Sequence, residues 1–327
     1  MKKKHLVHKK TKNTRKKSKS KTSKSRKSRN NRKTKKSLNV LKVTNQPDKL
    51  SCSPKPRNQI NEYSCYTNKS LLKLKNMWNA RHEDVIITSD EPKEIHRQLT
   101  NYLADVCEKE SCWLKQHSEF GKDTKELVDS FAPVSSEKWK KNPREWLDST
   151  DIIKVMKQYE KANPDFEFVG PSPIDFDTRM LYGECVWDEL CNFSLSEQIK
   201  RGKTKIGFIF NTDPHNKPGE HWISMFLDIN EKFIFYFDST GDKIPKRIKV
   251  LVKRIQEQGL LLGLDIKYDD THKIPHQKKN TECGMYSLFF IAYMLENKIN
   301  AKFLKDNIIG DDYVAKYRNI FFNKSLD

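Results

Sequence analysis

The sequence predicts an α+β fold, in which helices pack on a mixed sheet, preceded by a helical N-terminal extension. Two observations lead to this prediction. From residue 143 onward, short apolar strands alternate with amphipathic helices, as in proteins built on one sheet with helices packed against it. Later in the chain, the stretch from Gln277 to Leu295 changes abruptly from a polar loop to an apolar helix at Cys283.

Residues 1–36 predict a disordered basic tail. They contain 19 Lys or Arg and no Asp or Glu, which leaves only +1 of the net charge of +20 for the other 291 residues. Such a segment cannot bury enough apolar surface to offset the entropy lost on ordering. We expect it to contact DNA or RNA through phosphates with little sequence preference. The alternatives are a nuclear-localisation signal or a tail that only aids solubility.

The chain has neither the apolar region of a signal peptide nor an apolar run approaching the roughly 18 residues of a transmembrane helix. Its seven cysteines stand at irregular spacing, which predicts no disulfide framework and suits a reducing compartment. We therefore expect a soluble intracellular protein without membrane contact. Cys107, Cys112 and His117 have a spacing that can begin a zinc site, but they lack a second pair of ligands, so we expect no metal.

Residues 37–59 are polar and contain prolines, so we expect a linker there. Residues 60–142 predict the helical extension, with a first helix near Leu71 to Trp78 and two helical patterns between 93 and 132. The second pattern stops at Pro133. The first pattern would place the following residues on one face: Ile95, Leu99, Tyr102, Val106 and Trp113.

Residues 143–327 form the predicted α+β domain. Ser149 or Thr150 can cap a helix that continues through Tyr159 and ends at Asn163-Pro164. The later elements are strands at Phe166–Val169, Ile206–Phe210, Trp222–Ile229, Phe233–Phe237 and Leu264–Tyr268, and an amphipathic helix at Pro245–Gln258.

Cys283 is a candidate nucleophile because it stands at the start of a buried helix. Unpaired backbone N–H groups and the positive end of the helix dipole favour an anion there, and hence the reactive thiolate. Gly284 would let another chain segment pass close to the sulfur. The alternative is that Cys283 is only a small buried apolar residue.

His221 and Asp238 lie on two neighbouring strands and are a candidate base and its orienting carboxylate. A tight turn at Ile229-Asn230 would place them directly opposite, whereas a turn at Asn230-Glu231 would make them diagonal neighbours on one face. Either register lets the carboxylate hold one imidazole nitrogen and leaves the other to accept the thiol proton. The alternative is a surface histidine beside an ordinary strand-end aspartate.

Three other histidines compete with His221. His215 lies in a segment rich in Pro and Gly, which indicates a loop, so we prefer His221. His272 and His276 lie in the loop before Cys283, and we rank them lower.

These residues together resemble the catalytic signature of the SUMO-protease superfamily, which includes the adenovirus maturation protease. His221-Trp222 is followed by Asp238 in YFDS, and Gln277 stands six residues before Cys283-Gly284. A narrower resemblance is to the maturation proteases of large cytoplasmic DNA viruses, of the African swine fever virus type. It covers about residues 143–296 and is carried by FVGPSPIDFDT, NTDPH, FDSTG and ECGMYSLFF, whereas EWLDSTDII resembles the Trp-Leu-Asn/Asp segment of the wider superfamily. Glu282 departs from the family, since SUMO proteases usually have Asp there.

The resemblance implies a papain-like cysteine protease core. Cys283 would attack the scissile carbonyl, and His221, oriented by Asp238, would act first as base and then as acid. Gln277 and the Cys283 N–H would form the oxyanion hole. Tryptophans at the positions of Trp146 and Trp222 would bracket a channel that admits only glycine. No metal or organic cofactor is implied.

The function implied is cleavage of viral structural polyproteins after Gly-Gly during virion maturation, in the virion and the host cytoplasm. One alternative is a deconjugase that removes SUMO or another ubiquitin-like protein. A different class is a non-catalytic packaging protein that binds nucleic acid. Four intact candidate residues argue against the last of these: His221, Asp238, Gln277 and Cys283.

Overall fold

The computed structural model describes residues 39–40, 51–117 and 125–326. The chain divides into two compact units, Met1–Ser37 and Leu38–Asp327, and all described residues belong to the second. The predicted basic tail lies outside the described residues, so its contact with nucleic acid stays a prediction.

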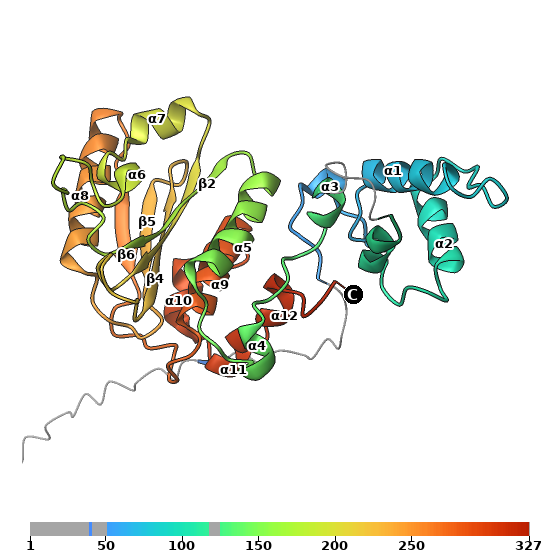
Figure 1. The fold of residues 1–327 in the computed structure, drawn as a ribbon. Coiled ribbons are helices and arrows are strands. Elements are labelled where there is room, and N and C mark those ends of the chain that lie inside the picture. The colour runs from blue at the N-terminus through green and yellow to red at the C-terminus, as the bar shows by residue number, and fades with distance from the viewer. Residues whose placement is uncertain (1–38, 41–50, 118–124, 327) are drawn as a thin grey trace, which may run out of the picture. The chain divides into compact units, whose positions relative to one another are not determined.

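A five-stranded mixed sheet forms the centre of the second unit, with strand order β2-β3-β4-β5-β6 (Figure 1). The outer pairs β2/β3 and β5/β6 are parallel, and the two inner pairs are antiparallel. The mixed sheet predicted from the sequence is therefore confirmed. The strands are β2 (Phe166–Pro173), β3 (Lys205–Asn211), β4 (Trp222–Asp228), β5 (Phe233–Phe237) and β6 (Lys267–Asp270).

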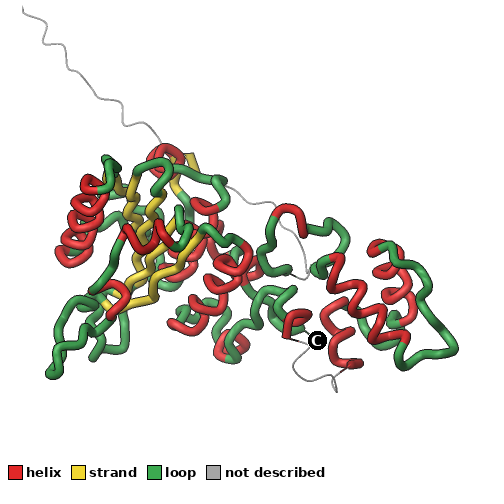
Figure 2. Tube along the Cα trace, turned by 90° about the horizontal axis from the view of Figure 1, so that it is seen from above, coloured by secondary structure: helices red, strands yellow, loops and turns green. Residues whose placement is uncertain are grey.

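Helices cover both faces of the sheet, because alternate strand residues point to opposite sides (Figures 1 and 2). Phe235 and Phe237 pack with helices α5 (Ser149–Ala162) and α9 (Cys283–Leu295) on one face. Ile234, Tyr236 and their neighbours pack under α8 (Lys246–Leu261) on the other face. Strands buried on both faces read as continuous apolar runs, which is why the sequence showed little alternation there.

The other elements of this domain are short. Strand β1 (Asn39–Val40), from the predicted linker, pairs in parallel with β7 (Asn307–Ile308). The short helices are α6 (Asp188–Cys191) and α7 (Leu195–Lys200), then α10 (Ala301–Asp306), α11 (Asp311–Ala315) and α12 (Arg318–Phe321) after α9.

Two predicted boundaries are wrong. The N-cap of α5 is Asp148, not Ser149 or Thr150, because the Asp148 carboxylate accepts the Asp151 N–H at 3.0 Å and Asp151 reciprocates. Strand β6 begins at Lys267 rather than at Leu264, because Leu264 still belongs to the turn that closes α8 and donates its N–H to Gly259.

The N-terminal extension is helical, as predicted, and has a hydrophobic core of its own around Tyr66, Leu71 and Leu99. The predicted helical face that runs on to Val106 is wrong. The helix ends at Tyr102 and Val106 is 60% exposed, because the chain turns there into a 3₁₀ segment. The elements are η1 (Arg57–Gln59), α1 (Asn68–Asn79), α2 (Pro92–Tyr102), η2 (Glu110–His117), α3 (Lys125–Val128) and α4 (Lys138–Lys141).

The prediction that the cysteines form no disulfide framework is also wrong. Six of the seven are paired, with Cα–Cα distances of 5.0 Å for Cys52–Cys65, 5.5 Å for Cys107–Cys112 and 6.2 Å for Cys185–Cys191. The pairs join residues close in sequence, so irregular overall spacing did not exclude them. Cys107 and Cys112 are therefore not available as zinc ligands. The intracellular location stays a prediction, but it loses its argument from the cysteines.

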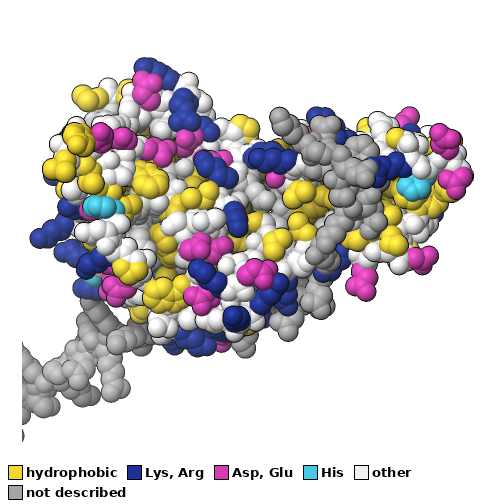
Figure 3. All heavy atoms as spheres, in the orientation of Figure 1, with side chains coloured by type: hydrophobic (Ala, Val, Ile, Leu, Met, Phe, Trp, Pro, Cys, Tyr) yellow, Lys and Arg dark blue, Asp and Glu magenta, His cyan; other side chains and the backbone are white. Residues whose placement is uncertain are grey.

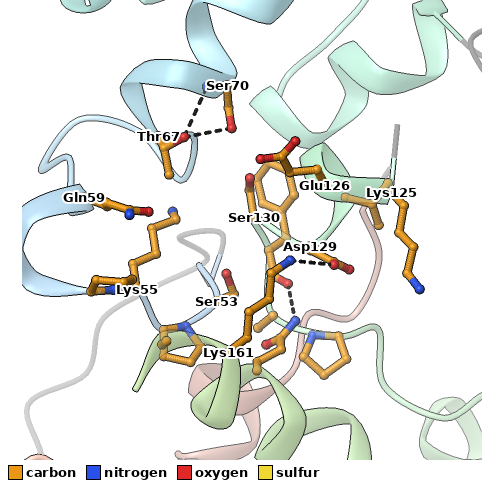
Figure 4. Close-up of a pocket in the computed structure, with 18 of the residues that line it drawn as sticks. Ser53, Lys55, Gln59, Thr67, Ser70, Lys125, Glu126, Asp129, Ser130 and Lys161 are labelled. Carbon is orange, nitrogen blue, oxygen red and sulfur yellow. Dashed lines mark hydrogen bonds and ion pairs between the residues drawn. The ribbon is translucent and has the colours of Figure 1, made fainter. Parts of the chain in front are cut away.

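The extension contacts the sheet domain through α5 and the C-terminal segment, where Asn323 donates to the Ala132 carbonyl. Lys161 on α5 lies 3.0 Å from Asp129, and Gln158 donates to the Phe131 carbonyl at 2.9 Å. These residues border a cavity of about 950 Å³, and Figure 4 shows Lys161 reaching across it to Asp129. None of the predicted site residues lines this cavity.

The described surface carries mixed charge. On the face shown in Figure 3, basic and acidic side chains are interspersed, in keeping with the small net charge outside the tail. Within the described ranges, every helix is too short or too polar to cross a bilayer.

Candidate active site

Cys283 is the first residue of α9 and is only 3% exposed. It is also the one cysteine of the seven that is not in a disulfide. The helix forms here because every residue from Met285 to Ala292 is buried between the sheet and α5, so apolar side chains are favoured all round. A Cβ added to Gly284 would lie 2.9 Å from the Leu147 Cβ, so the segment that passes close to the nucleophile is the one before α5.

His221 and Asp238 lie at the ends of two paired strands, just before β4 and just after β5. Ser224 pairs with Phe237, which is the register of the Asn230-Glu231 turn and makes the two side chains diagonal neighbours. His221 Nε2 lies 2.9 Å from Asp238 Oδ1. The imidazole therefore presents its other nitrogen, Nδ1, for a second partner.

Cys283 is a second hydrogen-bonding partner of the His221 side chain, and this bond contributes to the shifted pKa of His221. Burial alone would lower this pKa, but hydrogen bonds with Asp238 and with Cys283 outweigh the burial and raise it. The imidazolium is thus favoured beside a carboxylate and a thiol. This arrangement allows proton transfer from the thiol to the ring.

Asp238 is held as a carboxylate by a turn that the sequence analysis missed. Its Oδ1 accepts the Thr240 N–H at 2.9 Å and the Thr240 hydroxyl at 2.8 Å. Burial would raise the pKa of Asp238, but the bonds from His221 and Thr240 lower it below its ordinary value. The Asp-Ser-Thr-Gly run contained the signal, because Asp commonly accepts from the backbone two residues on.

Gln277 lies in the loop before α9 and its side chain is anchored at both ends. Its Oε1 accepts the Ser239 hydroxyl at 2.6 Å, and its Nε2 donates to the Lys279 carbonyl. Ser239 follows Asp238 directly, so Gln277 is tied to the same strand end as the His–Asp pair. The backbone of the loop is held by Asp311, which accepts the Lys279 N–H at 3.2 Å and which no sequence pattern indicated.

The two tryptophans differ in exposure. Trp222 is 9% exposed and donates its indole N–H to the Leu147 carbonyl at 2.9 Å. Trp146 is 40% exposed and precedes the residue that packs on Gly284. Trp222 thereby fixes the segment that carries Trp146 close to Cys283.

The remaining histidines have other partners. His215 Nδ1 lies 2.7 Å from Asp175, at the edge of the sheet. His276 is fully buried and accepts the Ile309 N–H at 3.2 Å, and burial lowers its pKa to about 4. His272 is exposed. The described contacts bring only His221 to Cys283.

Comparisons with known proteins agree with this architecture. Residues 203–323 match the C-terminal catalytic domain of the Ulp1 protease family. The chain is 30% identical over 267 residues to a protein of Acanthamoeba polyphaga mimivirus that is named as a thiol protease, covering 80% of this chain and 84% of that one. It is 33% identical over 250 residues to a SUMO-1 cysteine protease of African swine fever virus, covering 70% and 89%.

The fold is also that of a solved relative. The crystal structure of an African swine fever virus protease aligns with a TM-score of 0.58 at 21% identity, covering 86% of this chain and 98% of that one. Fold and relatives together define the class as cysteine protease. The chain belongs to the Ulp1 protease family.

Proposed function

We propose that this protease is an endopeptidase that cleaves viral structural polyproteins after Gly-Gly during virion maturation, with His221, Asp238 and Cys283 as its triad. The observation that supports the triad most directly is the position of His221, which bonds Asp238 through Nε2 and Cys283 through its other side. The viral origin of the relatives supports a role in a virus.

In this mechanism, Cys283 transfers its proton to His221 and its sulfur attacks the scissile carbonyl carbon. The resulting tetrahedral intermediate collapses to a thioester as His221 returns the proton to the leaving amine. Water, activated by the same imidazole, then hydrolyses the thioester and releases the acid. Asp238 keeps the ring oriented and stabilises the imidazolium through both steps.

The oxyanion of the intermediate would be held by the Cys283 N–H and Gln277 Nε2. An amide nitrogen carries two hydrogens, and the bond to the Lys279 carbonyl uses one of them. The other is left for the substrate. A donor of this kind typically contributes about 10² to 10³ in rate because it is placed where charge develops.

Glycine selectivity would come from Trp146, with Trp222 holding it in place. The exposed indole of Trp146 can cover a substrate backbone that enters next to Leu147, and a Cβ on the substrate would meet its ring. Excluding one methyl group discriminates by roughly 1 to 3 kcal/mol. A peptide with Gly-Ala in place of Gly-Gly before the scissile bond should therefore lose about 10- to 200-fold in kcat/KM.

The matched pair Trp222→Phe and Trp187→Phe tests this selectivity. Trp222 is buried and Trp187 is partly buried, but only Trp222 bonds Leu147. Trp222→Phe should narrow the difference between the two peptides, and Trp187→Phe should leave it unchanged. Equal rates of the wild type on both peptides would contradict the selectivity.

A second candidate function is removal of a ubiquitin-like protein, since the African swine fever virus relative is named as a SUMO-1 protease. Incubation of wild type and Cys283→Ala with both a Gly-Gly-Xaa precursor fragment and a SUMO fusion separates the two. We expect new termini after Gly-Gly in the precursor, and slower cleavage of the fusion, which offers the same Gly-Gly bond beside a folded domain. Cleavage of the fusion alone would favour deconjugation.

We further propose that residues 1–36 tether the protease to nucleic acid. Phosphate contacts made by 19 cationic side chains should weaken steeply as salt rises. Removal of the tail should abolish binding to a mixed-sequence DNA duplex at low salt. Unchanged affinity after removal would contradict the tether.

A further inference from the structure

The residue just before the nucleophile carries a buried charge. Glu282 is 0% exposed, and its Oε2 lies 2.9 Å from Arg318 Nε. Arg318 itself is only 6% exposed. The pair links the peptide that leads into Cys283 with α12, 36 residues further along the chain.

Arg318 holds more than the carboxylate. Its guanidinium lies 4.4 Å from the centre of the Trp139 ring, and its Nη2 donates to the Thr281 carbonyl at 3.4 Å. One side chain therefore contacts both residues that precede Cys283. Lysine offers neither the planar stacking surface nor the two-point donor geometry that these contacts use.

Helix α12 is itself well anchored, so Arg318 is a fixed support. Asn323, at its end, accepts the Ser51 N–H and donates to the Ala132 carbonyl, both at 2.9 Å. Ahead of it, the Tyr317 hydroxyl donates to Tyr293 on α9 at 2.8 Å. The support for the nucleophile loop thus extends into the N-terminal extension.

Stability alone does not explain this pair. Burying two charges carries a desolvation penalty of several kcal/mol per ion, and apolar residues of similar volume are often equally stable or more so. What the pair provides instead is one defined position for the backbone at Glu282. The Glu282 carbonyl accepts the Tyr286 N–H at 2.8 Å, which begins α9.

We propose that Glu282 and Arg318 are positioning residues for the nucleophile. They hold the peptide before Cys283 so that its N–H faces the oxyanion and its sulfur stays against His221. This inference rests on the proposed triad. Because neither residue touches the substrate, the pair should affect the chemical step and not substrate binding.

The test uses variants of the full chain. Arg318→Met alone leaves a buried carboxylate unpaired and is expected to destabilise the fold. The double variant Glu282→Gln/Arg318→Met removes both charges and should recover most of the melting temperature. The matched control is Glu167→Gln/Arg201→Met, which removes a pair 3.0 Å apart near the start of β2, away from the site.

The double variant should lose about 10- to 100-fold in kcat on a Gly-Gly peptide, with KM nearly unchanged. A displacement of the Cys283 sulfur by about 1 Å is enough to cause a loss of this size. The control pair should keep wild-type kcat. Arg318→Lys keeps the charge but not the planar contacts, so its kcat should lie between that of the wild type and that of the double variant. If the double variant regains both melting temperature and kcat, the pair has only a structural role and the inference is wrong.

A second readout does not depend on any substrate. Cys283 is the one cysteine outside the disulfides, so iodoacetamide labels a single site. At pH 6.5 the labelling rate reports proton transfer to His221, whereas at pH 10 hydroxide in the solution can take the proton instead. The double variant should label about 10-fold more slowly at pH 6.5 and at the wild-type rate at pH 10.

Equal labelling of wild type and double variant at both pH values would overturn the positioning role. If the wild type cuts no Gly-Gly peptide but the labelling difference is present, the proposed substrate is wrong and the positioning role stands. The two failures are thereby distinguishable.

Discussion

Two of the histidine–carboxylate pairs in the described part of the chain have nearly the same N–O distance. His221 lies 2.9 Å from Asp238, and His215 lies 2.7 Å from Asp175. In both pairs the histidine lowers the pKa of the carboxyl group against the effect of burial. Distance and charge therefore do not separate a site from a structural contact.

The pairs differ in what surrounds them. His221 is mostly buried at a strand end and has Cys283 as a second hydrogen-bonding partner, whereas the His215 side chain is 39% exposed in a loop. Asp175 also accepts the His215 backbone N–H at 2.8 Å, so that pair pins a loop. We therefore propose His221, and not His215, as the base, because the scaffold gives its ring both a carboxylate and a thiol as partners.

The largest expected loss of activity comes from replacing His221 or its partner Cys283. Cys283→Ala and His221→Ala should each lower peptidase activity by more than about 10³-fold, since each removes an essential step of acyl transfer. His215→Ala is the matched control and should stay within about threefold of wild type. Wild-type turnover by Cys283→Ala would refute the mechanism.

Replacing the carboxylates gives a smaller effect. Asp238→Asn keeps the shape that orients the ring but removes the charge that stabilises the imidazolium, so kcat should fall, though by less than in His221→Ala. Asp175→Asn should leave kcat almost unchanged. Equal losses of kcat in Asp238→Asn and Asp175→Asn would contradict the proposed difference between the two pairs.

His276 provides a third case for comparison with the two pairs. It is fully buried, and its hydrogen bond is to the Ile309 N–H and not to a carboxylate. Its pKa is about 4 in the folded protein against an ordinary 6.5, so the unfolded chain takes up the proton first as pH falls. Its stabilising contribution is therefore complete above pH 6.5 and is lost as pH falls towards 4. The loss is about 3 kcal/mol, from 1.36 kcal/mol per pKa unit.

The measurement is urea unfolding of wild type and His276→Gln at several pH values. Glutamine keeps an oxygen to accept the Ile309 N–H but does not titrate. We expect the variant to lose less stability than wild type between pH 6.5 and 4.5. If the unfolding free energies of wild type and His276→Gln change in parallel with pH, His276 does not titrate with a lowered pKa.

The smallest effect is expected from the loop pair itself. His215→Gln should lower the melting temperature by a few degrees at most, because its bond to Asp175 is exposed and partly screened. Differential scanning calorimetry on wild type and variant checks this. A large loss of kcat in a variant that still melts within a few degrees of wild type would give His215 a role in the site.

The sequence alone determined the elements whose pattern is local. The helix after Cys283 runs to Leu295 as its apolar run indicates, and β5 spans the predicted Phe233–Phe237. His221, Asp238, Gln277 and Cys283 could be named as candidates because residue type and spacing along the chain carry that information. Their chemical roles stay proposals.

The tertiary structure decided what depends on contacts between distant segments. The register of β4 and β5 was left open between two turns, and the folded chain has the one that makes His221 and Asp238 diagonal neighbours. Likewise Leu147 against Gly284, Asp311 on the Lys279 N–H and Arg318 on Glu282 join residues 32 to 137 positions apart. No local period encodes such pairs, because they exist only once the folded chain brings the two segments within contact distance.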